Sequence, residues 1–333
     1  MSKKSKTLKN NAKPKTLKKM PTSTIRVVHP NAAGIDLGSE IHFVSVSPEK
    51  TEASIRDFRC FTPDLLKMVE FLKSCQVDTV ALEATGVYWI PVYEILESHK
   101  IKVFLVNECH LKNVRGKKDD AKDSDWIREL HTYGLLNASF VPPDEIREIR
   151  DYWRLRDQHI KSASREVNHM QKSLDLMNLH PHKVISDLTG KTGMAIIQAI
   201  LDGERDPARL EKHRDSRIRC SEEELIASLT GNYREAHLFQ LRQALDLYRF
   251  YQQKIAECDE QLEKKRDGFE PEAPPLPGTL QRQRPQGNAP TFDGQSHLFR
   301  CFGVDLTQID GISSQTALTI FSEVGADFSK FKK

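Results

Sequence analysis

Residues 32–46 have the sequence AAGIDLGSEIHFVSV, and this stretch predicts the start of an α/β fold. Two short apolar runs flank Gly38, a pattern typical of a strand, a tight turn and a returning strand. Gly34 and Gly38 are expected to let the backbone turn beside Asp36. An acid at the end of a buried strand is costly unless it is paired, hydrogen-bonded or bound to a metal. Asp36 is therefore the first candidate site residue.

The residues that follow alternate between strand and helix patterns. The predicted strands cover 54–61, 77–82 and 101–106, and the predicted helices cover 63–75, 87–99 and 123–136. Alternation of this kind indicates a sheet with helices on its faces. We therefore expect an α/β domain over residues 25–143.

Three further acids fall at the ends of these elements. Glu83 follows the strand 77–82, whereas Asp120 and Asp123 lie three residues apart at a helix start, which places both on one helical face. Ligands of α/β sheets bind where strand ends meet helix starts. Carboxylate oxygens suit Mg²⁺, and two such ions about 4 Å apart support phosphodiester chemistry. The sequence thus predicts a divalent-metal site.

Each acid also has a structural interpretation. Asp36 can cap the turn after its strand, and Glu83 can cap the helix expected from Val87. Asp120 and Asp123 are residues that favour the first turn of any helix. The metal prediction depends on the order and placement of the four acids together.

The second half of the chain has a seven-residue apolar repeat. The repeated positions are Trp153, Ile160, Val167 and Leu174, with Ala163, Met170 and Met177 beside them, and later Leu241, Tyr248, Ile255 and Leu262. Two long helices, 145–178 and 238–264, separated by short helices over 180–233, predict an antiparallel coiled-coil arm; an ordinary helical bundle is the alternative. Arg156 falls within the seam, and we expect its charged head to snorkel out to solvent.

Proline and glycine then mark a linker. Residues 268–298 contain six Pro and four Gly and predict a flexible connection. Beyond it, residues 304–331 suggest a helix, a hairpin containing Gly311 and a second helix, which is typical of backbone N–H groups that contact a phosphate. A small packing motif without DNA contact is the alternative.

Charge is distributed unevenly. The net charge is +3, but residues 1–20 carry eight Lys and no acid, so the remainder has a net charge of −5. A basic arm over residues 1–24 suggests contact with a polyanion, or else a solubilising tail. The arm lacks the apolar core of a secretory signal, and no apolar run approaches 18 residues, so no membrane segment is expected. The six Cys show no metal or disulfide spacing.

At these residues the sequence resembles the DEDD transposases of the insertion-sequence 110 family, especially its 1111 subgroup. The matching segments are NAAGID at 31–36, EATGVYWIP at 83–91, NVRGKK at 113–118 and HTYGLL at 131–136, followed by HMQK at 169–172, MNL at 177–179 and GERDP at 203–207. The similarity extends over about residues 26–265 and 304–331. The family usually has Thr or a similar residue where this chain has Asp119.

The resemblance implies an RNase H-like, or RuvC-like, N-terminal domain in which Asp36, Glu83, Asp120 and Asp123 are the catalytic residues and bind Mg²⁺ or Mn²⁺. It also implies a coiled-coil dimerisation region over 144–267 and a small helical C-terminal piece, 299–333, belonging to the transposase domain. In the family, a nucleophilic Ser lies in a Gly-rich segment after the hairpin. This sequence ends at Lys333, and we expect it to be truncated before that Ser.

The function implied is that of a DNA transposase, a site-specific recombinase that cuts and rejoins element ends and target. The implied partners are DNA, a structured guide RNA encoded by the element, and further copies in a homodimer or tetramer. A cytoplasmic, nucleoid-associated bacterial protein is expected. The alternatives are a RuvC-like metal-dependent nuclease and a non-catalytic DNA- or RNA-binding remnant.

Overall fold

The computed structural model describes residues 26–107, 120–266 and 287–331, with the side chains of 120–122 and 266 excluded. The chain forms two compact units, residues 1–141 and 142–333, and each is described by itself. The predicted basic arm and residues 268–286 of the predicted linker lie outside the described residues. None of the described helices is long and apolar enough to cross a membrane.

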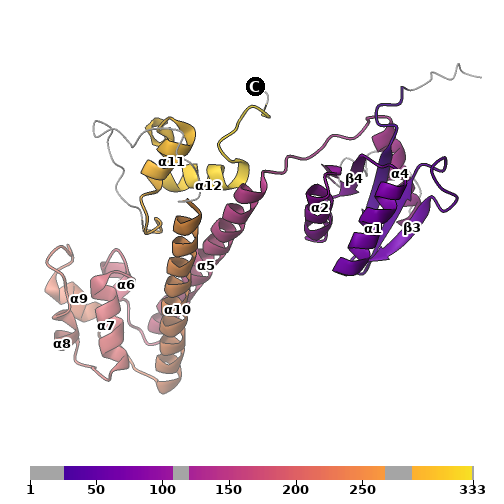
Figure 1. Ribbon diagram of the computed structural model, residues 1–333. Coiled ribbons are helices and arrows are strands. Elements are labelled where there is room, and N and C mark those ends of the chain that lie inside the picture. Colours follow the sequence, from indigo (N-terminus) through magenta and orange to yellow (C-terminus); the bar gives the residue numbers. More distant parts are fainter. Residues whose placement is uncertain (1–25, 108–119, 267–286, 332–333) are drawn as a thin grey trace, which may run out of the picture. The chain divides into compact units, whose positions relative to one another are not determined.

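The first unit contains a five-stranded mixed sheet (Figure 1). Its strands are β1 (Ala32–Leu37), β2 (Ile41–Val46), β3 (Ile55–Arg59), β4 (Thr79–Glu83) and β5 (Lys102–Val106), in the order β3-β2-β1-β4-β5. The first three are antiparallel neighbours, whereas β4 and β5 run parallel to β1. This topology is consistent with the predicted α/β RNase H-like domain.

Helices cover both faces of this sheet. Helices α1 (Thr62–Ser74) and α2 (Trp89–Ser98) share a core with alternate residues of the strands, among them Ile35, Val44 and Leu82. Helix α4 (Asp120–Thr132) packs through Ile127 and Leu130 against Ala81 and Val106 on the opposite face. Because successive strand residues face opposite sides, β4 and β5 each contribute to both cores.

The second unit is built on two 32-residue helices, α5 (Asp144–Asp175) and α10 (Glu235–Arg266). Lys265 Nζ lies 2.6 Å from Glu148 Oε1, and Arg156 pairs with Asp259, so the two helices run antiparallel. Most residues of the apolar repeat are buried, namely Trp153, Ala163, Met170, Leu174, Met177, Leu241, Ile255 and Leu262. The antiparallel pair is observed, whereas a coiled-coil arm remains a prediction.

Smaller helices pack on opposite ends of this pair (Figure 1). Helices α6 (Pro181–Val184), α7 (Lys191–Leu201), α8 (Pro207–Glu211) and α9 (Glu222–Ser228) share a core with Met170, Leu174 and Leu241. Helices α11 (Gly294–Phe302) and α12 (Ser314–Val324), with the 3₁₀ turn η1 (Leu306–Gln308), share a core with Ile149, Trp153 and Leu262.

The C-terminal helices contact α5 directly. Arg154 forms two hydrogen bonds with Glu323, both of 2.8 Å, and Trp153 Nε1 donates to Thr319 Oγ1 at 3.1 Å. Phe292, within the predicted linker range, is buried in the same core, and α11 begins two residues later. Residues 292–324 therefore pack as part of the second unit.

The expectation for Arg156 was wrong. Its guanidinium does not reach solvent, because its side chain is 2% exposed and lies 2.5 Å from Asp259 Oδ1, itself on a 1% exposed side chain. Arg156 also donates to the carbonyl oxygen of Asn288 at 3.0 Å, and the amide of Thr291 donates to Asp259 at 3.0 Å. A charged pair can remain buried when every polar atom finds a partner, which the sequence periodicity does not reveal.

Candidate metal centre

Asp36 and Glu83 lie next to each other on parallel strands. In the register of β1 and β4, Ile35 is opposite Leu82, and Asp36 and Glu83 are the next residue of each strand. Neighbours in register point to the same face, and the backbones of adjacent strands are about 4.8 Å apart. Both side chains are half-buried at the carboxyl ends of their strands. The sheet itself therefore brings these two acids together.

Helix α4 covers the face to which both acids point. Gly34 and Ala81 precede Asp36 and Glu83 by two residues, and so share their face. Ala81 belongs to the core formed with α4. A Cβ on Gly34 would lie 2.2 Å from the carbonyl oxygen of Ser124 and 2.3 Å from the amide nitrogen of Arg128. Only glycine allows the helix backbone to lie this close to the strand.

The role expected of Gly34 was therefore wrong. It does not turn the chain, because it lies inside β1. The turn to β2 comes later, where the amide of Gly38 donates to the carbonyl oxygen of Ile41 at 3.0 Å. Gly34 instead makes room for a helix that lies about 90 residues further along the chain, which local sequence cannot show.

The direction of α4 places its N-terminus near the acids. Thr79 begins β4, and its Oγ1 lies 3.0 Å from Nε2 of His131 in the last turn of α4. The helix consequently runs antiparallel to β4, and its first residues lie toward the strand end that carries Glu83. Asp123 directly precedes Ser124, the residue in contact with Gly34. Asp120 is the first residue of α4, but its side chain lies outside the described part of the chain.

A third acid of helix α4, Asp125, has a structural role. Asp125 Oδ1 accepts hydrogen bonds from Ser45 Oγ at 2.7 Å and from Arg128 Nε at 2.8 Å. Ser45 is fully buried on β2, so this contact joins α4 to the sheet. Sequence reasoning missed Ser45, Arg128 and the anchoring role of Asp125, since nothing in the run DDAKDSDW distinguishes its acids.

The capping interpretation of Glu83 was also wrong. Helix α2 begins only at Trp89, and its N-cap, Tyr88, has no side-chain hydrogen bond. Asp36 lies within β1 rather than in the turn that follows. The described candidates, Asp36, Glu83 and Asp123, offer oxygen atoms only, which is the donor set that Mg²⁺ and Mn²⁺ prefer. This donor chemistry fits a hard divalent cation.

His131 gives the first unit a pH dependence. It is 1% exposed and stacks on His29, with ring centroids 4.6 Å apart. Burial, then His29 and Lys102, lower the pKa of His131 to about 4. An unfolded histidine titrates near 6.5, so the unfolded chain binds more protons between pH 6.5 and 4. The contribution of neutral His131 to the free energy of unfolding is fully present above pH 6.5. It is lost as the pH falls through this window, by up to about 3 kcal/mol.

We therefore expect the variant His131→Gln to lose less stability than the parent between pH 7 and pH 4.5, because Gln retains a hydrogen-bonding group for Thr79 but has no proton to gain. Urea titrations at the two pH values measure the difference. The exposed His213→Gln is the matched control and should follow the parent. Equal losses of stability in the parent and in His131→Gln would show that His131 does not cause the pH dependence.

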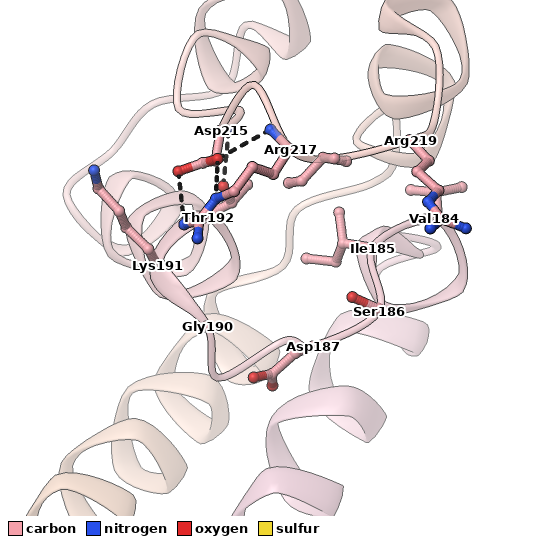
Figure 2. Close-up of a pocket in the computed structure, with 11 residues that line it drawn as sticks. Val184, Ile185, Ser186, Asp187, Gly190, Lys191, Thr192, Asp215, Arg217 and Arg219 are labelled. Carbon is pink, nitrogen blue, oxygen red and sulfur yellow. Dashed lines mark hydrogen bonds and ion pairs between the residues drawn. The ribbon is translucent and has the colours of Figure 1, made fainter. Parts of the chain in front are cut away.

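A separate pocket lies in the second unit, beside the start of α7 (Figure 2). It encloses about 530 Å³, and its charged lining residues are Asp187, Lys191, Asp215, Arg217 and Arg219. The guanidinium of Arg217 donates two hydrogen bonds to Asp215, of 2.9 and 3.2 Å, and its amide donates a third of 3.0 Å; these bonds lower the pKa of Asp215 to about 2. The lining therefore has mixed charge, with Arg217 already paired.

Comparison with known protein families matches the first half of the chain to one of them. Residues 33–179 match the family model of the DEDD transposases of insertion sequence 110, which is described as a transposase. The matched range begins in β1 and ends after α5. No curated protein matches the chain.

Proposed function

Since residues 33–179 form a transposase domain of the DEDD insertion-sequence 110 family, we propose that the protein cuts and rejoins DNA at the ends of an insertion sequence and at its target. The supporting observation is the meeting of Asp36 and Glu83 on β1 and β4 beneath the N-terminal half of α4. We assign Asp36, Glu83, Asp120 and Asp123 as the metal ligands and catalytic residues.

The assignment is supported by the fixed positions of the elements that carry the four acids. Two ligands come from adjacent central strands, and two come from one helix that Gly34 and Asp125 hold against the sheet. Carboxylates placed together repel one another, and a cation removes that repulsion. Bound Mg²⁺ or Mn²⁺ supplies charge stabilisation and activation of the attacking oxygen in phosphodiester chemistry. The protein's part is to hold the four carboxylates in position before DNA arrives.

The nucleic-acid partners follow from the family. We propose that a structured RNA encoded by the element guides the choice of target. The Lys-rich arm, residues 1–20, would add affinity for phosphates without sequence preference, because each neutralised phosphate releases counterions. This arm lies outside the described residues, so the proposal depends on its charge alone.

Self-association is the third part of the proposal. Phe239, Leu247 and Phe250 are 64%, 43% and 49% exposed on α10. Their spacing of eight and three residues places them along one face of the helix. An exposed apolar stripe of this kind is typical of a surface that contacts another protein. We propose that it joins copies of this chain in a homodimer or tetramer.

The test combines the protein with element-end DNA, target DNA, the candidate guide RNA and Mg²⁺. Cleavage at the element ends that requires the guide RNA and Mg²⁺ is the expected result, and joined DNA products would demonstrate the rejoining step as well. Hydrolytic nicks alone would favour the metal-dependent nuclease. Binding without any cleavage would favour a non-catalytic DNA- or RNA-binding role.

A further inference from the structure

A second set of metal-ligand side chains lies in the second unit, where α5 ends. Asp175 is the last residue of α5, His180 follows a short turn, and His182 lies in α6. One ligand atom of each residue lies within 4.8 Å of the other two. Two imidazoles and one carboxylate form a donor set distinct from the oxygen-only acids of the first unit.

Hydrogen bonding orients the first imidazole toward the carboxylate. His180 Nε2 lies 3.0 Å from Asn178 Oδ1, and His180 Nδ1 lies 2.8 Å from Asp175 Oδ1. Because the amide oxygen only accepts, it fixes a proton on Nε2. In the neutral ring, Nδ1 then has a lone pair that faces a carboxylate oxygen. A metal ion placed between Nδ1 and the carboxylate would use this lone pair. Metal-binding histidines commonly donate their other N–H to an oxygen in this way.

The second imidazole faces the same oxygen. His182 Nε2 lies 3.4 Å from Asp175 Oδ1. His182 Nδ1 is buried and has no hydrogen-bond partner among the described residues. Ligands about 2.0–2.1 Å from a tetrahedral Zn²⁺ are separated by about 3.4 Å, since the edge of a tetrahedron is about 1.6 times the distance to its centre. The 3.4 Å between His182 Nε2 and Asp175 Oδ1 already matches this separation. The 2.8 Å between His180 Nδ1 and Asp175 Oδ1 would have to increase by about half an ångström.

The backbone that carries these ligands is fixed on both sides. Met177 and Leu179 are fully buried, and the amide of Asn232 donates to the carbonyl oxygen of Met177 at 2.7 Å. The amide of His180 donates to Ser228 in α9, also at 2.7 Å. Such support reduces the conformational entropy that the ligand-bearing segment loses when a metal ion binds. Asp175 has 45% of its side chain exposed, which leaves a path from solvent.

We propose that Asp175, His180 and His182 bind a transition-metal ion of the Zn²⁺ class, with Asn178 as a positioning residue. Imidazole ligands favour such ions over Mg²⁺, and three protein ligands leave a further coordination position open. The ion would join the end of α5 to α6. This inference does not rest on the transposase function proposed above.

The experiment measures Zn²⁺ binding by calorimetry with the untagged full chain. Asp36→Asn and Glu83→Gln are introduced first, and excess Mg²⁺ is added, so that the acids of the first unit do not contribute. One Zn²⁺ per chain with micromolar or tighter affinity is expected. Asp175→Asn, His180→Gln and His182→Gln should each weaken binding at least tenfold, and Asn178→Ala about tenfold. The control is His169→Gln, because His169 forms a two-residue pair with Glu166 on α5 without a third ligand.

Co²⁺ supplies an independent readout. Intense visible absorption typical of tetrahedral coordination should appear with one equivalent and disappear in His180→Gln and His182→Gln. Circular dichroism of the metal-free variants shows whether they fold, and the exposed Asp175→Asn is the least perturbing of them. Binding weaker than about 1 mM, or unchanged affinity in Asp175→Asn and both histidine variants, would overturn the proposal.

Discussion

Asp36→Asn, Glu83→Gln and Asp123→Asn are each expected to lower the rate of Mg²⁺-dependent DNA cleavage by about 10³-fold or more, without unfolding the protein. The amides keep the size of each side chain but remove the charge that holds the cation. Asp36 and Glu83 are neighbours on adjacent strands, so removing one charge also relieves repulsion when no metal is bound. The melting temperature of the metal-free variants should therefore equal or exceed that of the parent.

Two measurements together test this prediction. Single-turnover cleavage gives the rate, and thermal melting with and without Mg²⁺ shows whether the variants lose the stabilisation conferred by the ion. Glu129→Gln is the matched control, because Glu129 lies on the same helix as Asp123 but is exposed, and it should keep both cleavage and Mg²⁺ stabilisation. A full cleavage rate in any of the three variants would remove that residue from the site.

Asp259→Ala is expected to lower the free energy of unfolding by about 3–5 kcal/mol. The substitution leaves the guanidinium of Arg156 buried without its carboxylate, and it also removes the acceptor of the Thr291 amide. The double variant Arg156→Met/Asp259→Leu should recover most of the loss, because an apolar pair of similar volume leaves neither charge buried. Urea denaturation followed by circular dichroism measures the stability of the parent and of both variants.

The same two helices contain a matched control. Glu148 and Lys265 join α5 to α10 through an ion pair with side chains 46% and 42% exposed. Glu148→Ala should cost no more than about 1 kcal/mol, because solvent screens an exposed pair. Similar small losses for Asp259→Ala and Glu148→Ala would show that the buried pair contributes no more than a surface one.

The elements of both units could be predicted because their signals are local. Short runs rich in apolar residues predicted β1, β2, β4 and β5, and seven-residue repeats predicted the buried faces of α5 and α10. The strand ends that carry Asp36 and Glu83 could be predicted for the same reason, whereas their adjacency depends on the pairing of β1 with β4. Periodicity predicts which face is buried but not which charged residues share it.

The features that the sequence did not reveal are contacts between distant segments. Arg156 stays buried because Asp259, 103 residues away, pairs with it. His131 is buried against Thr79, and Asp125 differs from Asp123 only because Ser45 lies beside it. Each outcome depends on a partner that no window of local sequence contains.

The contact at Gly34 has a consequence for reading evolutionary comparisons. Any other residue at this position would push α4 away from β1, and with it the two candidate ligands that the helix carries, Asp120 and Asp123. Selection on the acids should thus act equally on Gly34, and an alignment of relatives is expected to show it as invariant as Asp36. A score based on conservation alone would then rank a residue with no side chain among the catalytic ones. Its invariance would record the close approach of a helix rather than a step in chemistry.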